Sequence, residues 1–163
     1  MTKPLMVHVI TNFAGVGGAE MMLARLIQCT EQQYKHVIIA LMKTSEVYQS
    51  TLDRCQAHYA LDWNGINTLG TVSKLRTLLK KLQPATVQCW MYHANVLTSL
   101  SIIGLAQKPK VVWGIHHSLA SPKDESISTK IALGLSKILS QQASAIIYCA
   151  HSSMQQHQAF GFK

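Results

Sequence analysis

A chain of 163 residues, with 48% hydrophobic and 13% charged residues, has the length and the apolar content for one domain with a sizeable core. Fifteen Lys and Arg residues against seven Asp and Glu, with eight His besides, favour anionic partners such as phosphorylated ligands or acidic lipids. The longest apolar runs fall short of the roughly 20 residues of a membrane-spanning helix, and the run 5–10 is too short for a signal peptide.

Apolar runs and helical stripes alternate along the chain. We expect strands at 5–10, 36–42, 58–61, 85–91, 110–115 and 144–149, and helices at 19–30, 46–56, 68–83, 96–106, from 121–124 to 139, and at 152–160. The strands are continuous apolar runs, as in sheets that are covered on both faces. The predicted fold is a single α/β domain over 1–163: a doubly wound, mostly parallel, Rossmann-like sheet of about six strands with helices on both faces.

Two of the expected helices have recognisable starts. Asn95 is placed to cap the helix 96–106. In the segment 121–124 a Ser is followed by Pro and then by Asp, which is a helix-start pattern, and Ile131, Leu135, Ile138 and Leu139 continue that helix with apolar side chains on one face.

No two cysteines have C-x-x-C spacing, so neither a zinc ribbon nor a redox motif is indicated. The chain has four of them: Cys29, Cys55, Cys89 and Cys149. Reduced thiols in the cytoplasm are the expected state. Cys89 and Cys149 fall in predicted strands, where a cysteine usually serves as a small buried hydrophobe.

A glycine turn follows the first strand. Gly15, Gly17 and Gly18 would allow a ligand to approach the backbone, and the helix that begins there presents free N–H groups to an anion. Glu20 stands where a dinucleotide fingerprint needs a third glycine, and no Gly-Lys-Ser/Thr of a P-loop follows. A tight strand-to-helix turn without any ligand explains the glycines equally well.

Histidines follow three of the later strands, in the segments 92–95, 116–118 and at His151. Because carboxyl ends of parallel strands share one edge, these histidines should gather near the glycine turn, where imidazoles can bind sugar hydroxyls or phosphate or move a proton. A single histidine at a strand end is more often structural, but the shared location favours function. His116 and His117 should point to opposite faces, which argues against a metal site formed by this pair. His93 and His117 could instead share a metal, but no carboxylate is placed to complete that site, and no metal is expected.

The helix 68–83 carries Lys74, Arg76, Lys80 and Lys81. Such a helix usually has a solvated basic face, and it would also suit anionic lipid head groups. Nucleic acid is not an expected partner, because the basic residues are not interleaved with exposed aromatic residues.

The chain resembles the N-terminal domain of family-four glycosyltransferases, which have the GT-B fold and transfer sugar with retention. The resemblance rests on four segments: Gly15 to Glu20, like a Gly-Gly-Ala-Glu loop; Trp90 to Asn95, like a post-strand histidine segment; Trp113 to Ser118, like W-x-I-R-H-S; and Tyr148 to Ser153 followed by His157 and Gly161-Phe162. His116 departs from the usual arginine, and Cys149-Ala150 from the usual Asn-Ser.

The resemblance implies two Rossmann-like domains that face a cleft, with this chain on the acceptor side and the nucleotide-sugar donor held by a C-terminal domain outside it, usually without metal. It implies that Gly15, Gly17 and Gly18 lie near the donor phosphates and that His93 acts near the reacting centre. It further implies that His117, with Ser118 and Asn95, lines the cleft. The acceptor would be a glycan or a lipid-linked acceptor, and the setting cytoplasmic, with a peripheral position on the inner membrane face as one option. The isolated domain should be inactive. The alternative is a standalone nucleotide- or phosphate-binding module without catalysis.

Overall fold

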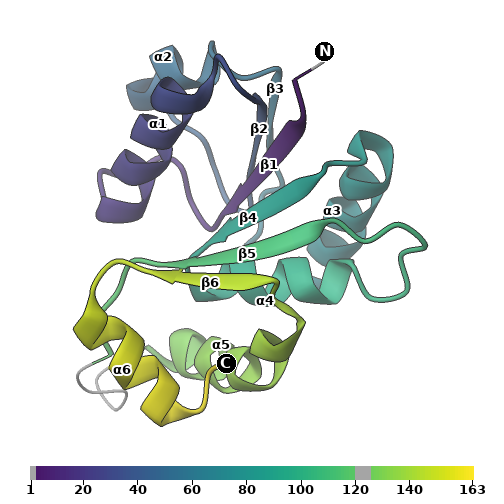
Figure 1. Ribbon diagram of the computed structural model, residues 1–163. Helices are drawn as coiled ribbons and strands as arrows, with labels where there is room; N and C mark the ends of the chain where they lie inside the picture. The colour runs from purple at the N-terminus through teal and green to yellow at the C-terminus, as the bar shows by residue number, and fades with distance from the viewer. Residues whose placement is uncertain (1–2, 120–125) are drawn as a thin grey trace.

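Six parallel strands form one sheet in the order β3-β2-β1-β4-β5-β6 (Figure 1). The computed structural model describes residues 3–119 and 126–163. The strands are β1 (Leu5–Ile10), β2 (Lys35–Ala40), β3 (Ala57–Ala60), β4 (Thr86–Trp90), β5 (Lys110–Ile115) and β6 (Ala145–Tyr148). The helices are α1 (Gly18–Thr30), α2 (Gln49–Leu52), α3 (Thr68–Leu82), α4 (Met91–Ser101), α5 (Ile127–Leu139) and α6 (His151–Phe160), with 3-10 turns η1 (Glu46–Tyr48) and η3 (Ser140–Gln142). The α/β class and the parallel, doubly wound sheet predicted from the sequence are confirmed.

The strand order reverses between β1 and β4. From β1 the chain builds outward to β2 and β3, then returns to the other side of β1 and builds outward again through β4, β5 and β6. Because right-handed crossovers place the helices of the two halves on opposite faces, α1 and α2 lie over one face and α3, α4 and α5 over the other (Figure 1). The two halves diverge at the carboxyl ends of β1 and β4, the point at which open parallel sheets generally bind ligands.

Two apolar clusters hold these layers together. Val7 and Val9 belong to the larger cluster, with the side chains of α3, α4 and α5, whereas Ile10 belongs to the smaller one, with α1 and α2. This split follows from the alternation of side chains along a strand. The helices on both faces bury the central strands, as their continuous apolar sequences predicted.

Several expected boundaries were wrong. The helix expected at 96–106 begins at Met91, directly after β4, and ends at Ser101, so Asn95 is a buried residue of the second helical turn and not a cap. The helix expected at 46–56 is a 3-10 turn followed by the short α2. The start pattern at 121–124 lies outside the described residues; α5 is described from Ile127, and the Ser126 side chain accepts a hydrogen bond from the Thr129 N–H.

A buried chain of hydrogen bonds links β4, β1, β2 and α1. Trp90 Nε1–H donates to His8 Nδ1 at 3.4 Å, so His8 carries its proton on Nε2 and donates to His36 Nδ1 at 3.0 Å. His36 then donates from Nε2 to the Thr30 hydroxyl at 3.2 Å, and that hydroxyl donates to the Leu26 carbonyl. The chain is complete only when both rings are neutral. Burial, together with the neighbouring His36, lowers the pKa of His8 to about 3, and burial also lowers the pKa of His36.

We expect this histidine pair to make the fold sensitive to acid. His8 stays neutral in the fold but binds a proton in the unfolded chain, so the free energy of unfolding is at its full value above pH 6.5 and falls as the pH drops toward 3. The slope is about 1.4 kcal/mol per pH unit for one such group. Urea unfolding between pH 7 and pH 4 should show a shallower loss in His8→Gln than in the wild type. His58→Gln, at an exposed histidine on β3, is the matched control, and equal slopes in all three proteins would contradict the assignment.

Candidate functional site

The candidate site lies where the strand order reverses. β1 and β4 are neighbours in register, with Ile10 opposite Trp90, so the segments that follow them start side by side at the carboxyl edge of the sheet. The glycine turn follows β1, and α4 with His93 follows β4. Ligands of open parallel sheets bind at this kind of position.

The glycine turn is built from its own contacts. Phe13 forms backbone hydrogen bonds with Lys43 and Ser45 and stacks on Tyr48 at a ring distance of 4.2 Å. The Tyr48 hydroxyl donates to the Gly15 carbonyl at 3.0 Å. The connection from β2 to α2 therefore fixes the turn without any ligand.

The glycines of this turn are not required by its backbone. Gly15, Gly17 and Gly18 all lie outside the left-handed region. A Cβ on Gly15 or Gly18 would meet open space, while a Cβ on Gly17 would meet only the Glu20 carboxylate. Neither local packing nor backbone conformation therefore requires glycine at positions 15 and 18.

The first turn of α1 has its own carboxylate. Gly17 is the N-cap and offers no side-chain cap, and Glu20 lies in the first turn beside it. A carboxylate at this position stabilises the helix N-terminus. Burial, and secondarily the charge of Glu20, raise the pKa of Tyr48, which places Glu20 near the contact that holds the turn. A phosphate bound here would share the α1 N-terminus with this carboxylate.

β4 passes into α4 without an intervening loop. Met91, the first residue of α4, has a φ of 71°, in the left-handed region that non-glycine residues rarely adopt. Its sulfur accepts a hydrogen bond from the His116 N–H at 3.3 Å. This conformation costs of the order of 1 kcal/mol, and such strain is concentrated at functional sites. The junction directs the first turn of α4, with Tyr92 and His93, toward the carboxyl edge of the sheet.

His93 is half-buried and has an unused polar atom. Its ring lies 5.2 Å from the ring of Trp63, and burial lowers the pKa of His93 while a hydrogen bond with the Ser128 backbone acts in the opposite direction. Its Nε2 is buried and, among the residues that the structure describes, has no hydrogen-bond partner. A buried imidazole nitrogen without a partner is costly unless something else binds it. Asn95 is fully buried in α4, and its amide likewise finds no partner in the described part of the chain.

His116 and His117 point in different directions, as their alternation predicted. His116 stacks on Trp90 at 5.0 Å and lies against Gly114, and burial lowers the pKa of its imidazole. The ring of His117 meets Tyr92 edge-on at 6.3 Å, on the α4 side. His117 therefore contacts Tyr92, the chain neighbour of His93 in the first turn of α4, whereas His116 stacks on Trp90 of the smaller cluster.

The remaining predicted residues lie farther from the reversal point. Ser118 is exposed, and its hydroxyl donates to the Gln156 side chain of α6 at 2.9 Å. His151 is exposed at the start of α6, beyond the edge strand β6. Cys89 is buried as predicted, with its pKa raised to about 12 by burial, whereas the prediction for Cys149 was wrong because it is exposed beyond the end of β6.

Two contacts around the candidate site were not predicted from the sequence: the Tyr92–His157 hydrogen bond and the contact of Trp63 with His93. Tyr92 donates its hydroxyl proton to His157 Nε2 at 2.6 Å, and His157 Nδ1 donates to the Ser153 carbonyl at 2.7 Å. This pair joins α4 to α6, and the Ser153 hydroxyl donates to the His117 carbonyl, which fixes the strand end beside it. A Ser and a His four residues apart on a helix were the available signal. For Trp63, the signal was a tryptophan in a turn-rich segment after the third strand.

Within residues 3–119 and 126–163, the structure shows no group of three His, Cys, Asp or Glu side chains arranged to hold a metal ion. The same residues include no helix with both the length and the apolar character to cross a bilayer.

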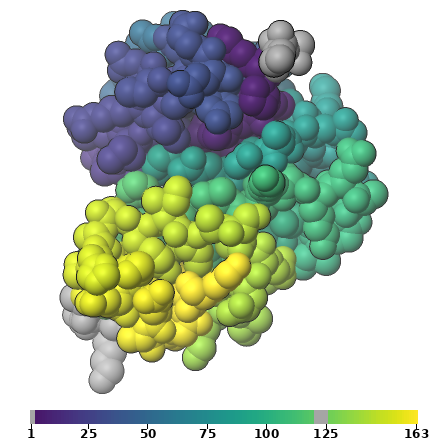
Figure 2. Space-filling model, in the orientation of Figure 1, coloured from purple at the N-terminus to yellow at the C-terminus, as the bar shows by residue number. Residues whose placement is uncertain are grey.

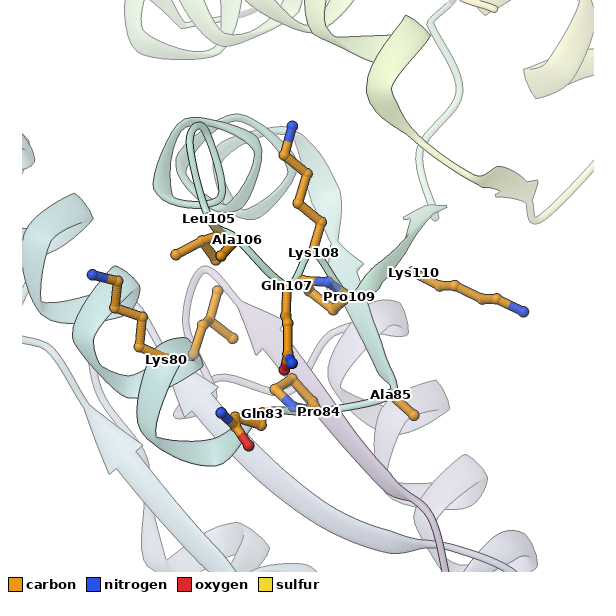
Figure 3. Close-up of a pocket in the computed structure, with 11 residues that line it drawn as sticks. Lys80, Gln83, Pro84, Ala85, Leu105, Ala106, Gln107, Lys108, Pro109 and Lys110 are labelled. Carbon is orange, nitrogen blue, oxygen red and sulfur yellow. The ribbon is translucent and has the colours of Figure 1, made fainter.

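A hollow of about 550 Å³ lies elsewhere (Figure 3). It is at the opposite edge of the sheet, between the end of α3 and the segment that leads into β5, with Leu79, Pro84 and Leu105 among its lining. Lys80, Lys108 and Lys110 stand at its rim, and their side chains point away from its centre (Figure 3). The hollow is therefore separate from the candidate site at the carboxyl edge.

The strand order and the parallel sheet define an open, Rossmann-like α/β domain. The chain belongs to Glycosyltransferase Family 4, whose family model matches residues 16–163. No curated protein sequence matches it.

Solved structures with this fold cover nearly the whole chain. HepE (Alr3699) of Anabaena, crystallised with UDP, superposes with a TM-score of 0.72 at 15% identity, over 99% of this chain and 42% of that one. The lipopolysaccharide outer core galactosyltransferase WaaB gives 0.72 at 13% identity, over 98% and 43%. A UDP-N-acetylglucosamine 2-epimerase from Rickettsia bellii gives 0.66 at 13% identity, over 99% and 43%. At these identities the similarity establishes the fold alone, and the chain spans less than half the length of these proteins.

We expect Tyr92→Phe to lower the free energy of unfolding by about 1–3 kcal/mol, because it leaves the buried Nε2 of His157 without its donor. Urea unfolding at pH 7 measures the change. Tyr59→Phe, on the edge strand β3, should cost less and serves as the matched control. Equal losses in the two variants would show that the Tyr92–His157 bond does not anchor α6.

Proposed function

We propose that this chain is the acceptor-side, N-terminal domain of a retaining glycosyltransferase that moves a sugar from a nucleotide-sugar donor to a glycan or lipid-linked acceptor. The observation that carries the proposal is the pairing, at the reversal point, of an open glycine turn after β1 with a half-buried His93 whose Nε2 is unpartnered among the described residues. Membership of Glycosyltransferase Family 4 supports it. Two solved structures of this fold, the complex of HepE with UDP and the galactosyltransferase WaaB, support it as well.

The proposed roles follow from where charge develops in the reaction. The bond between the sugar C1 and the diphosphate oxygen breaks, the acceptor oxygen bonds to C1, and the acceptor proton leaves with the nucleoside diphosphate. Negative charge therefore grows on the diphosphate, and backbone N–H groups at the start of α1, beside Gly17 and Gly18, are suited to stabilise it. A neutral His93 would donate to, or accept from, a sugar hydroxyl near C1. No step is assigned to a metal.

The assignments of the other site residues differ in their support. His117 lies beside Tyr92 and in this proposal would line the acceptor side of the site. Ser118 is exposed but already bonded to Gln156, and Asn95 is fully buried, so a ligand would reach either residue only after a local rearrangement. His93, His117 and the glycine turn are therefore the core of the proposed site.

We also place the protein at the cytoplasmic membrane face, on the strength of the family resemblance and the basic residues of α3. Lys74, Lys80 and Lys81 are exposed and available to anionic head groups. Arg76 is not equally free, because its guanidinium donates to the carbonyls of Ser101 and Ile103 and so satisfies the end of α4.

The alternative, a nucleotide- or phosphate-binding module without catalysis, is separated from this proposal by binding measurements. If the donor site lies mainly in a second domain, isothermal titration of residues 1–163 with UDP-sugars should show weak or no binding, and the full-length protein should bind and turn over. Tight binding by residues 1–163 alone, or no nucleotide-sugar binding by the full-length protein, would favour the module. The anomeric configuration of the product, read by NMR, tests retention.

We expect His93→Gln in the full-length enzyme to lower kcat by at least about tenfold, the usual effect of losing one polar contact to a transition state. Glutamine keeps a polar side chain of similar size, so the melting temperature should stay close to that of the wild type. His151→Gln, an exposed histidine at the same edge of the sheet but two strands away, is the matched control and should leave kcat unchanged. Wild-type kcat in a normally folded His93→Gln would remove His93 from the mechanism.

We expect Gly18→Ala to leave the fold intact but to reduce kcat/KM by about tenfold or more, because a methyl group there meets open space within this chain and would meet only a bound donor. Thermal unfolding should show equal or slightly higher stability, since alanine is the better helix former. Gly70→Ala, in α3 with similarly open space, should raise stability without changing activity. Full activity in Gly18→Ala would show that no substrate approaches this part of the turn.

A further inference from the structure

The helix α5 has two apolar faces, and only one of them is packed. Ala132, Leu133, Ser136 and Leu139 are buried against the rest of the domain. The opposite face is exposed along the whole helix: Ile127, Ile131, Leu135 and Ile138 have exposed fractions of 78%, 59%, 41% and 72%. The apolar face read from the sequence is thus largely this outer face, with Leu139 on the inner one.

The outer residues form a continuous stripe. Their spacing of four, four and three residues places them on one side of the helix, which we call the outer stripe of α5. Single exposed aliphatic side chains are common on protein surfaces, but a row of four large ones along a helix is typical of an interaction surface. Gly134 leaves no side chain to interrupt it.

Within the described residues of α5, both charged side chains are lysines. Lys130 and Lys137 are exposed on α5, and residues 126–163 contain no Asp or Glu. Long lysine side chains beside an apolar stripe can lie along it and extend their ammonium groups to the polar layer above.

The same charge pattern extends over the larger part of the domain. Residues 1–62 carry five Lys or Arg and five Asp or Glu, whereas residues 63–163 carry ten Lys or Arg and only two acidic residues, Asp124 and Glu125. These two stretches occupy different regions of the molecule, as the separation of the purple and blue chain from the teal-to-yellow chain shows (Figure 2). The layer of α3, α4 and α5 belongs entirely to the basic stretch.

An exposed apolar stripe flanked by lysines favours an anionic membrane surface over a second copy of the chain as its partner. A second copy of the chain, packed stripe to stripe about a two-fold axis, would bring Lys130 and Lys137 of both copies together, and α5 itself has no carboxylate to compensate them, which is unfavourable. An anionic bilayer surface offers both the apolar interior that the stripe needs and the negative head groups that the lysines need.

We propose that the outer stripe of α5 enters the head-group boundary of an anionic membrane, with Lys130 and Lys137 contacting lipid phosphates. The helix would lie in the plane of the interface and would not cross it. This inference deepens the membrane contact proposed above for α3, and so rests on that part of the proposed function; α3 supplies long-range attraction and α5 supplies apolar insertion. The two helices flank α4 in the same layer.

Vesicle sedimentation with the full-length protein tests the proposal. The probes are vesicles of phosphatidylcholine alone and of phosphatidylcholine with phosphatidylglycerol. Ile131→Gln combined with Ile138→Gln should lower partitioning onto the anionic vesicles by at least about tenfold, because two exposed side chains lose their apolar burial. Val47→Gln, at a similarly exposed aliphatic residue on η1 in the neutral part of the chain, should leave partitioning unchanged. Lys130→Gln with Lys137→Gln should weaken binding mainly at low salt.

Two further measurements separate the possible outcomes. Wild-type partitioning of the double isoleucine variant would overturn the proposal, and so would a change in the sedimentation coefficient of the lipid-free variant, since a protein surface would then cover the stripe. If the double variant melts early, Ile127→Gln in the first turn of α5, at the most exposed position of the stripe, provides the same test. Nucleotide-sugar binding measured on the same samples distinguishes the two proposals, because its absence with intact vesicle binding refutes only the glycosyltransferase function. Loss of binding in Lys80→Glu with Lys81→Glu, but not in the isoleucine variants, would confine the membrane contact to α3.

Discussion

The reversal of strand order between β1 and β4 is the constraint on which the rest of this domain depends. A parallel sheet that grows outward in both directions from one strand pair sends its crossover helices to opposite faces, so only at that pair do the loops diverge. The glycine turn and the start of α4 are the two segments that follow β1 and β4 at this point. Their chemistry is different, one offering backbone N–H groups and the other an imidazole, and the topology alone brings them together across some 75 residues of sequence.

Trp90 connects the interior of the domain to this edge. Its indole N–H starts the buried chain through His8 and His36 to α1, and the same ring stacks on His116 at the carboxyl end of β5. In this chain of hydrogen bonds, each neutral imidazole accepts on one nitrogen and donates on the other. It commits each ring to one tautomer, so the polar groups buried between β1 and α1 are satisfied without any charge.

The sequence was sufficient to predict the sheet, because the apolar runs of β1, β2, β4 and β5 are long, and because turn residues separate them from helices with clear stripes. The location of the glycine turn and of the histidine segments at one edge was predicted for the same reason, because residues that follow parallel strands must share an edge. The details of the site were not predictable. Asn95 can be a helix cap only if a loop follows β4. In the structure α4 begins directly at Met91, whose left-handed φ could not be predicted from a methionine side chain. Likewise a stripe of isoleucines on α5 does not say which of two apolar faces the core will take. Both outcomes depend on tertiary contacts between residues far apart in the sequence, which a local sequence pattern does not contain.

The loop-free junction between β4 and α4 has a consequence for the thermodynamics of ligand binding. A catalytic group on a flexible loop loses conformational entropy when its ligand immobilises it, and that loss reduces affinity. His93 stands in the first turn of a helix that continues a central strand, so its backbone is already as immobile as the sheet. The unfavourable φ of Met91 is incurred once, when the protein folds, and is compensated by the packing of α4 against its neighbours. In the proposed site, ordering of the imidazole would therefore add little entropic cost when a ligand binds, and the free energy of the contact would remain available to hold that ligand.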